Sequence, residues 1–388
     1  MIVYEIGTGY TPIPAQIGAA TEIVVEELSR ALRERGIAVR ILDVQAEKRK
    51  ETELPVEEIP VPRWLRREDL TLGVHHKLKR VAYSMCLSVR LRHLLKETEE
   101  IPILHFHNQY NLFFFLLLVP KRVRSKCFVA YTVHSGIWRL PWADIRGRIY
   151  HRYFQEAFCI RKADMVFVLN EETAQTVTSH LGVSAQRIKR IANGVNTDIY
   201  CPYPLENRMP MILQVGSVCE NKGQLRAVKL LLEPLKKHPN LTYAYAGGII
   251  EEDYQEKIRQ FTVAHGIGEQ VRYLGMIPPG KALAQLYRQA TATILPSRYE
   301  AFGLVAVESL ASGTPVLLPE DSPLRFGTGC VVYNEENIVE KATCLLENTG
   351  ELEEEARKNA RENYSWNKIA MDYEAVFAKR SGGKCLKN

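Results

Sequence analysis

The chain has 388 residues, of which 46% are hydrophobic and 25% are charged. This composition is that of a soluble globular protein, and the length predicts two domains rather than one. The eight cysteines are scattered without a C-x-x-C pair, and the N-terminus lacks the features of a signal peptide. The longest apolar run, Leu112 to Val119, is too short to span a bilayer, so we expect a cytoplasmic protein without disulfides.

The first half of the chain reads as strands that alternate with helices. Strands are predicted at "IVYEIG", "AVRILDV", "ILHFH", "CFVAYTVH" and "MVFVLN", and the first helix, "AATEIVVEELSRALRERG", ends at Gly36. Nearly continuous apolar strands separated by helices indicate a parallel sheet that is covered on both faces.

The second half repeats this design. Its predicted strands are "MILQVG", "LTYAYAG", "VRYLG", "ATILPS" and "PVLLP", and "SWNKIAMDYEAVFAKR" predicts a closing helix. Turn formers and prolines between Asn193 and Pro210 mark the join. The prediction is an α/β fold of two Rossmann-like, doubly wound domains, 1–203 and 204–364, followed at 365–388 by a helix that packs across the domains and a tail. Ligands of such sheets bind beyond the carboxyl ends of the strands, so a cleft between two facing sheets is the expected site.

The stretch "SRYEAFGLVAVESLASGTPVLLP" places Glu300 and Glu308 around the start of a predicted helix, near Gly303. Free backbone N–H groups at a helix start favour an anion such as phosphate. Carboxylates suit pairs of hydroxyl groups instead, because each oxygen accepts hydrogen bonds. Together these features describe a site for a sugar nucleotide, although Glu308 alone could be a solvated helix residue.

The same stretch resembles the E-x7-E region of retaining glycosyltransferases of family 4, which have the GT-B fold. Other segments resemble that family in the expected order: "GAATEIVVEELSRALRERGIAV", "YTVHSG", "ADMVFVLNEETAQ", "IANGVNTDIYCP", "QVGSVCENKGQ" and "VRYLGMIPPGKALAQLYRQATATILPS". The resemblance therefore extends over nearly the whole chain.

The resemblance implies a role for each matching residue. Glu300 would contact the donor sugar, Glu308 the ribose and Lys222 the diphosphate, while His134 would lie near the reacting carbon. The implied catalytic residues are His134, Lys222 and Glu300. The other implied donor-binding positions are Gly18, Gly216, Ser217, the backbone of Ile277, Ala301, Phe302, Gly303 and Leu304. Such enzymes are thought to need no protein nucleophile, because the leaving diphosphate takes the proton of the acceptor.

Two positions depart from the family pattern. Ser217 stands where the family usually has arginine, which removes one cation from the diphosphate site. Ile17-Gly18 replaces a pair of glycines in the N-terminal loop.

Metal ligation has little support in the sequence. His105 and His107 alternate on one predicted strand, but no third ligand follows at a suitable spacing. The chain also contains no D-x-D motif, so we expect no metal and no other cofactor.

Basic residues are concentrated in the first half of the chain. Residues 1–200 carry 29 Lys and Arg against 22 Asp and Glu, whereas residues 201–388 carry 22 against 23. The segment Arg63 to Lys96 interleaves basic and apolar side chains, as in a helix that lies on an anionic membrane. It could equally be a solvated helix face. No nucleic-acid-binding module is recognised.

These observations predict a metal-independent, retaining glycosyltransferase that moves a hexose-type sugar from a nucleotide sugar, most simply a UDP-sugar. The expected acceptor is a lipid-linked or cell-surface glycan precursor, and the protein would be cytoplasmic, with peripheral contact at the inner face of the membrane. Two alternatives stay open: a GT-B epimerase or hydrolase of sugar nucleotides, and a non-catalytic subunit that binds them.

Overall fold

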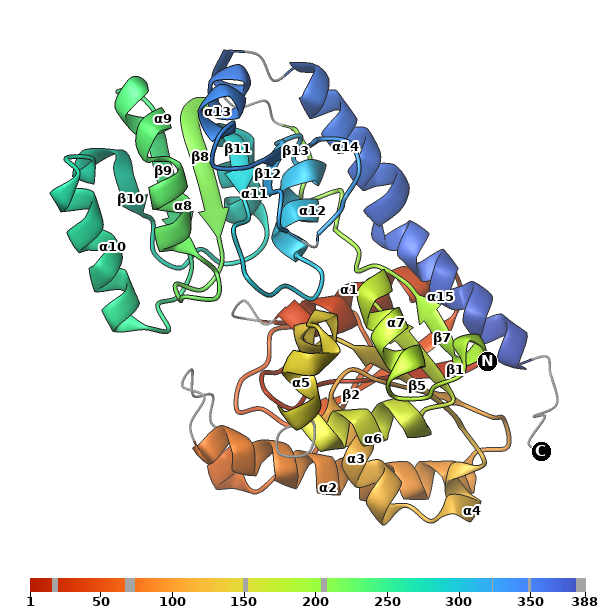
Figure 1. Cartoon of the computed structure of the whole chain (residues 1–388). Helices are drawn as coiled ribbons and strands as arrows, with labels where there is room; N and C mark the ends of the chain where they lie inside the picture. The colour runs from red at the N-terminus through yellow and green to blue at the C-terminus, as the bar shows by residue number, and fades with distance from the viewer. Residues whose placement is uncertain are drawn as a thin grey trace. The chain divides into compact units, whose positions relative to one another are not determined.

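The computed structural model describes residues 1–15, 20–66, 74–148, 153–203, 208–322, 324–347 and 350–381, with backbone only at 380 and 381. The chain divides into two compact units. Unit 1 combines Met1–Asn193 with the chain from Trp366 onward, and unit 2 is Gly194–Ser365. Each unit contains one sheet with helices packed around it (Figure 1).

Unit 1 contains a seven-stranded sheet in the order β3-β2-β1-β4-β5-β6-β7, with all pairings parallel. Its strands are β1 Ile2–Ile6, β2 Ala38–Val44, β3 Val56–Ile59, β4 Ile103–Phe106, β5 Phe128–Val133, β6 Met165–Val168 and β7 Ile188–Arg190. Its helices are α1 Ala20–Glu34, α2 Val74–Glu97, α3 Gln109–Leu118, α4 Lys121–Arg124, α5 Trp142–Arg148, α6 Phe154–Lys162, α7 Glu171–Ser179 and α15 Trp366–Ser381.

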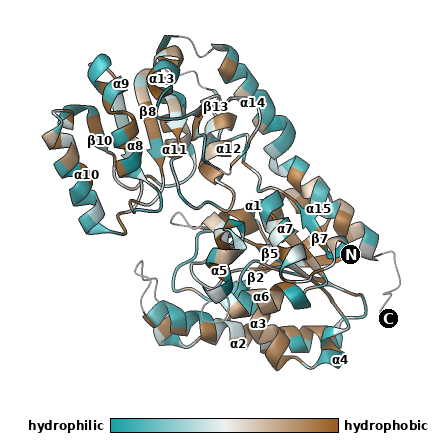
Figure 2. Ribbon diagram, viewed as in Figure 1, coloured by the Kyte–Doolittle hydropathy of each residue, from teal (hydrophilic) through white to brown (hydrophobic). Residues whose placement is uncertain are grey.

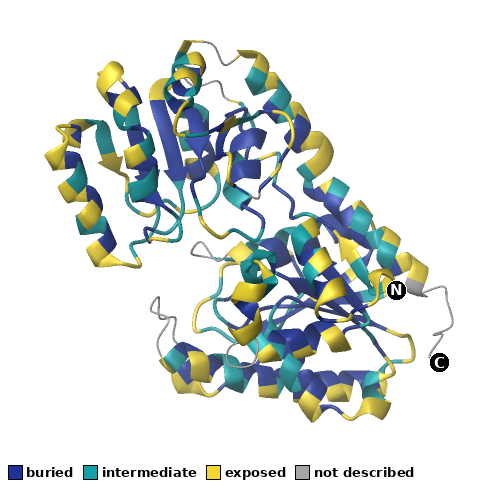
Figure 3. Ribbon diagram, viewed as in Figure 1, coloured by how far each residue is buried: buried dark blue, intermediate teal, exposed yellow. Residues whose placement is uncertain are grey.

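The strands of unit 1 turn alternate side chains to opposite faces of the sheet, as their period of two requires. Tyr4 and Ile6 of β1 join a large core with Leu87 of α2 and Phe115 of α3. The other face receives α1 and α15, which pack against each other. Arg35, directly after α1, forms an ion pair with Glu374 of α15 with N···O 2.6 Å. The strands of this sheet are predominantly buried (Figure 3).

Unit 2 contains a six-stranded parallel sheet in the order β10-β9-β8-β11-β12-β13. Its strands are β8 Met209–Val215, β9 Thr242–Ala246, β10 Val271–Tyr273, β11 Ala290–Ile294, β12 Val316–Pro319 and β13 Cys330–Tyr333. Its helices are α8 Gln224–Leu230, α9 Leu232–Lys237, α10 Glu252–Ala264, α11 Lys281–Gln289, α12 Leu304–Ala311, α13 Ile338–Glu347 and α14 Gly350–Tyr364. Apolar strands and a polar outer helix, α10, are visible in Figure 2.

The predicted fold class, two Rossmann-like domains with parallel sheets, is confirmed. The closing helix α15 belongs to unit 1, where its Tyr373 and Phe377 are buried. The apolar run at Leu112 to Val119 forms most of α3 rather than a strand or a span. No helix among the described residues is long and apolar enough to cross a membrane. The seven cysteines in the described part of the chain are all free thiols.

Candidate functional site

The carboxyl edge of the second sheet carries the residues singled out in its sequence. The strand β8 ends at Val215 and leads into the loop that contains Lys222. The strand β11 ends at Ile294 and leads through Glu300 into α12, whose N-cap is Gly303 in the left-handed conformation, with φ of 88°. Because β8 and β11 are parallel neighbours, their two loops emerge side by side at this edge.

Lys222 and Glu300 form an ion pair across these two loops. The ammonium Nζ of Lys222 lies 2.9 and 2.8 Å from the two carboxylate oxygens of Glu300. Asn221 holds the loops together, since its side chain donates to the Tyr299 carbonyl at 3.2 Å and accepts from the Tyr299 N–H at 3.2 Å. Its carbonyl also accepts from the N–H of Arg298 at 2.9 Å. Sequence reasoning missed Asn221, whose only signal is its place directly before Lys222.

Gln214 fixes Lys222 from the strand side. Its amide donates to the Lys222 carbonyl at 2.8 Å and accepts from the Tyr243 hydroxyl at 2.7 Å. Gln214 is a buried amide in the otherwise apolar strand "MILQV", which is the signal by which the sequence could have identified it.

Glu308 lies on α12 as a half-buried residue, and its carboxylate accepts hydrogen bonds from tyrosine hydroxyls. Burial raises the pKa of Glu308 to about 7. Hydrogen bonds from the Tyr287 hydroxyl, at 3.0 Å, and from Tyr200 lower the pKa but do not outweigh burial. No cation contacts this carboxylate among the described residues. Glu308 therefore differs from Glu300: it carries a proton below about pH 7, whereas Glu300 is held by an ammonium group.

Two glycines let the chain turn tightly at this edge. Gly216 has φ of 147°, and Gly247, after β9, has φ of 149°. A Cβ on Gly247 would lie 2.1 Å from the Gly216 carbonyl oxygen, so only glycine fits there. The first of these was expected from the sequence and the second was not.

The remaining expected positions lie along the same edge. Ile277 follows β10, in a loop that contacts the loop after β9 through the Gly247 N–H and the Gly275 carbonyl, at 2.9 Å. Ser217 follows Gly216, and its carbonyl accepts from the Gln224 amide at 3.0 Å. Ala301, Phe302 and Leu304 lie beside Gly303, with Phe302 buried and the other two half-buried.

A separate cavity of about 490 Å³ lies at the opposite edge of this sheet. Its lining includes Arg208 directly before β8 and Gly313 shortly before β12. The Arg208 guanidinium is bound within the protein, because it donates to the Gly313 carbonyl at 2.8 Å and forms an ion pair with Glu353 at 2.9 Å. The arginine thus has a structural role in closing the amino edge.

In unit 1, His134 follows β5 and is the half-buried end of a chain of otherwise buried hydrogen bonds. Its Nε2 lies 3.0 Å from Nδ1 of His107, and Nε2 of His107 lies 2.7 Å from a Glu5 carboxylate oxygen. Nδ1 of His105 lies 3.1 Å from the other oxygen, and its Nε2 lies 2.7 Å from the Thr132 hydroxyl. We call Glu5, His105, His107 and His134 the histidine network.

Burial and contact set the protonation of the histidine network. Burial alone would raise the pKa of Glu5, but the adjacent His105 and His107 outweigh it and lower the pKa to about 2. Burial lowers the pKa of His107 to about 4 and places that of His134 well below its usual value. Glu5 is therefore ionised at neutral pH, while His107 and His134 are uncharged.

Glu5, His105 and His107 also offer the one grouping, within the described ranges, whose ligand atoms could surround a metal ion, all within 4.8 Å of one another. Sequence reasoning did not identify Glu5 as the third member. The three side chains are fully buried, and the hydrogen bonds between them account for their arrangement without an ion. We therefore treat them as a hydrogen-bonded group.

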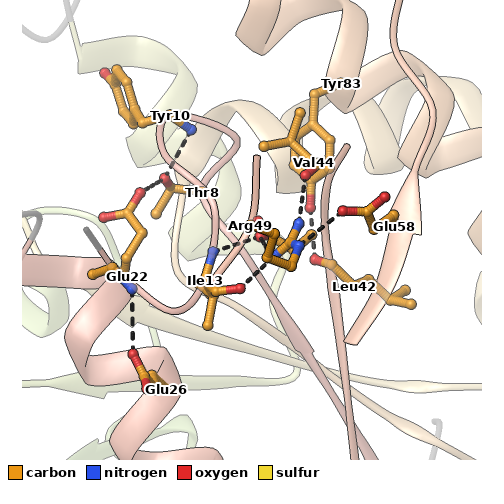
Figure 4. A network of polar contacts seen from close by, with 12 residues as sticks. Thr8, Tyr10, Ile13, Glu22, Glu26, Leu42, Val44, Arg49, Glu58 and Tyr83 are labelled. Atoms are coloured by element: carbon orange, nitrogen blue, oxygen red, sulfur yellow. Dashed lines mark hydrogen bonds and ion pairs between the residues drawn. The ribbon is translucent and has the colours of Figure 1, made fainter. Parts of the chain in front are cut away.

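The loop after β1 is anchored to β2 (Figure 4). The Arg49 guanidinium donates to the buried carboxylate of Asp43 at 2.8 Å and to the Val44 carbonyl at 2.8 Å. The N–H of Ile13 donates to the same carboxylate at 2.8 Å. Gly18, expected to approach a ligand from this loop, lies outside the described residues. The part of the loop before it is therefore held by Asp43 and Arg49.

Two family models match the chain in succession. The model of glycosyltransferase family 4 matches residues 21–199, and that of glycosyl transferases group 1 matches residues 202–363. An uncharacterised glycosyltransferase of Methanocaldococcus jannaschii is 28% identical over 235 residues, which are 55% of this chain and 59% of the relative. The chain thus spans little more than half the length of that relative.

Solved structures with this fold cover nearly the whole chain. Sucrose-phosphate synthase of Thermosynechococcus elongatus aligns with a TM-score of 0.77 and 19% identity, over 99% of this chain and 100% of its own. The HepE protein of Anabaena, in complex with UDP and glucose, aligns with a TM-score of 0.68 and 15% identity, over 97% and 99%. These likenesses establish the GT-B fold. The two family models, which together match residues 21–199 and 202–363, show that the chain belongs to the group 1 glycosyltransferases.

Proposed function

We propose that this chain is a retaining glycosyltransferase that moves a hexose-type sugar from a nucleotide sugar, in the simplest case a UDP-sugar, to a glycan or lipid-linked acceptor. The observation that carries the proposal is the Lys222–Glu300 ion pair at the carboxyl edge of the second sheet. Glu300 lies shortly before α12, the helix that carries Glu308. The complex of the HepE protein with UDP and glucose supports the choice of UDP.

Each of the three side chains suits one part of such a donor. Lys222 is a compact cation that can move from Glu300 to the diphosphate and stabilise the charge that develops as the diphosphate leaves. Glu300, released from the ammonium, would then accept hydrogen bonds from the hydroxyls of the sugar. Glu308 would accept from the ribose hydroxyls, and His134 would contact the transferred sugar.

The proposed chemistry needs no metal. The diphosphate charge would be met by Lys222 and by backbone N–H groups around Gly216 and Gly303, where the left-handed backbone allows close approach. Ser217, in place of an arginine, can add a neutral hydrogen bond but no charge.

The acceptor side of the proposal rests on unit 1. Along α2, Val74, Leu78, Met85 and Val89 are exposed apolar residues spaced by four and seven, so they lie along one stripe of the helix. Basic side chains accompany them, namely the exposed Lys77, Arg92 and Lys96. We propose that this α2 stripe contacts an anionic membrane that carries a lipid-linked acceptor. Figure 2 shows apolar and polar residues mixed along α2.

Thermal-shift screening tests the donor site. UDP, GDP, ADP and their common sugars would be added to wild type and to Glu308→Ala, because a ligand of the folded state raises the melting temperature. The proposal expects a shift with one nucleotide, much reduced in the variant. No shift with any nucleotide would contradict it. Product formed without an acceptor would instead favour an epimerase or hydrolase, and binding without turnover would favour a non-catalytic subunit.

A further inference from the structure

The histidine network places ionisable side chains in the buried part of the first sheet. Glu5, His105 and His107 have no exposed surface beyond 3% on strands that otherwise bury apolar side chains. Burying an ionised carboxylate is strongly unfavourable unless hydrogen bonds compensate it. The strand register brings a hydrogen-bond partner next to the carboxylate, because Glu5 of β1 pairs with His105 of β4. All the network residues fall on the same face, because they alternate with core residues such as Tyr4 and Phe106.

The hydrogen positions in the histidine network follow from the carboxylate. An ionised carboxylate only accepts hydrogen bonds, so the ring nitrogen of His107 that faces Glu5, Nε2, must carry a hydrogen. An uncharged imidazole has one such hydrogen, which leaves Nδ1 of His107 as an acceptor. The nitrogen 3.0 Å away, Nε2 of His134, must therefore be the donor of that contact.

We propose that Glu5 acts through His107 as a positioning residue for His134, holding it as the Nε2-protonated tautomer so that Nδ1 accepts a hydrogen bond from a substrate hydroxyl. No hydrogen bond to this Nδ1 is formed within the described part of the chain. The relevance of the tautomer to transfer rests on the proposed function, in which His134 contacts the transferred sugar. The tautomer itself does not depend on that function.

The assigned tautomer selects what His134 can bind. A nitrogen lone pair attracts the O–H of a sugar or acceptor and repels a phosphate oxygen, which also carries lone pairs. The opposite tautomer, with its hydrogen on Nδ1, could donate to a phosphate oxygen as well as to a hydroxyl oxygen, so it would not discriminate against the diphosphate. Glu5, two side chains away, would thus determine that His134 recognises a hydroxyl group rather than the diphosphate.

The far end of the histidine network supplies a matched control. The Thr132 hydroxyl lies 3.3 Å from the Tyr373 hydroxyl of α15, beyond His105 as seen from Glu5. Removing the Tyr373 hydroxyl leaves Thr132 able to donate to His105 and changes nothing between Glu5 and His134. In Glu5→Gln, by contrast, the amide can donate to His107 and so reverse the direction of both following hydrogen bonds.

The test is a ¹H–¹⁵N spectrum of the imidazole rings of the free, full-length protein, labelled with ¹⁵N-histidine at neutral pH. The His134 signals are identified by their loss in His134→Asn. We expect wild type and Tyr373→Phe to show His134 protonated on Nε2 alone. We expect Glu5→Gln to show loss of this single form and a population protonated on Nδ1. His107→Phe, which has no polar atom to connect Glu5 with His134, provides the same comparison if Glu5→Gln does not fold.

Three results would overturn the inference: a wild-type His134 protonated on Nδ1, an unchanged tautomer in both Glu5→Gln and His107→Phe, or stoichiometric metal bound to the network histidines. Adding UDP and UDP-glucose to wild type then tests the ligand. UDP-glucose should shift the Nδ1 signal of His134 more than UDP does. An equal shift would contradict the inference that Nδ1 accepts a hydrogen bond from a sugar hydroxyl. Because the tautomer is measured without ligand, its failure is distinct from a failure to bind nucleotides.

Discussion

The ammonium of Lys222 lies within 2.9 Å of both carboxylate oxygens of Glu300. Each group therefore neutralises the other in the free protein, at the place where the proposed donor binds. The pair is partly exposed, with 25% and 15% of the side-chain surfaces accessible, so we expect it to be worth about 1 kcal/mol or less. A diphosphate can consequently take Lys222 from Glu300 at low cost.

The first prediction separates the two partners. Lys222→Ala should weaken binding of UDP and of UDP-glucose alike, by roughly 10- to 100-fold for the loss of a charged hydrogen bond. Glu300→Gln should leave UDP affinity within a few-fold of wild type and remove the extra affinity that the sugar gives. Isothermal titration calorimetry of both ligands measures this, and an equal loss of UDP binding in the two variants would contradict the separate roles.

The second prediction concerns pH. Burial raises the pKa of Glu308 to about 7. The ionised carboxylate, which would accept hydrogen bonds from the two ribose hydroxyls, is therefore formed only as the pH rises through that value. Nucleotide affinity should therefore increase from pH 6 to pH 8, by at most about tenfold per pH unit. Glu308→Gln should bind more weakly, without this increase. A wild-type affinity that is flat over this range would show that the protonation of Glu308 does not matter.

The same shift has a consequence for stability. The folded protein holds the Glu308 proton up to about pH 7, whereas an unfolded chain releases it near 4.5. The contribution of this group to stability is thus lost as the pH rises from 4.5 to 7. Glu308→Gln should gain stability relative to wild type over this interval in urea unfolding.

The third prediction tests the crowded turn after β9. In Gly247→Ala, the new methyl group would meet the Gly216 carbonyl, so the loop before Lys222 must move. We expect a loss of stability of more than about 2 kcal/mol together with loss of nucleotide binding. Gly266→Ala is the control, because it also has positive φ, of 70°, but open space around it. If both variants lose stability and nucleotide binding equally, the losses come from backbone strain alone and not from the contact with the Gly216 carbonyl.

The fourth prediction tests the α2 stripe. Leu78→Asp with Met85→Asp should abolish co-sedimentation with vesicles of phosphatidylcholine and phosphatidylglycerol, because two charges would enter the apolar boundary. Val263→Asp, which also replaces an exposed apolar residue by aspartate, on α10 of unit 2, should leave co-sedimentation unchanged. Wild type that binds neither these vesicles nor pure phosphatidylcholine would rule out the membrane contact.

The fifth prediction concerns the anchored loop of unit 1. Arg49→Met leaves the buried Asp43 without its cation and should cost about 3–5 kcal/mol at pH 7. Burial already raises the pKa of Asp43 despite Arg49, so the variant should recover stability as the pH falls and Asp43 takes up a proton. Asp43→Asn in the Arg49→Met background should restore part of the loss at pH 7. Urea unfolding at pH 5 and pH 7 provides the measurement, and a pH-independent loss would point to packing instead.

The sequence could predict the interior strands and the carboxyl-edge residues, because long apolar runs and the position of Glu300 before a helix are local signals. It did not predict the edge strands β3, β7 and β13, which have only three or four residues and partly exposed side chains. The sequence also did not predict contacts between segments that are far apart in the chain. The pairing of Glu5 with His105 depends on the register of β1 and β4, which are about 100 residues apart. A lone glutamate in an apolar strand was the available signal.

The placement of α15 in unit 1 makes unit 2 an insertion within another folded body. The chain leaves unit 1 near Asn193 and returns near Trp366, and these two passages are paired, with the Val195 N–H donating to the Tyr364 carbonyl at 2.7 Å. On the ribosome, the first sheet is therefore synthesised long before the helix that covers one of its faces. His105, which contacts Tyr373 of that helix, stays uncovered until all of unit 2 has been made. Unit 2 can complete its core as a continuous segment, whereas Glu5 and its histidines can be fully buried only after unit 2 has been synthesised.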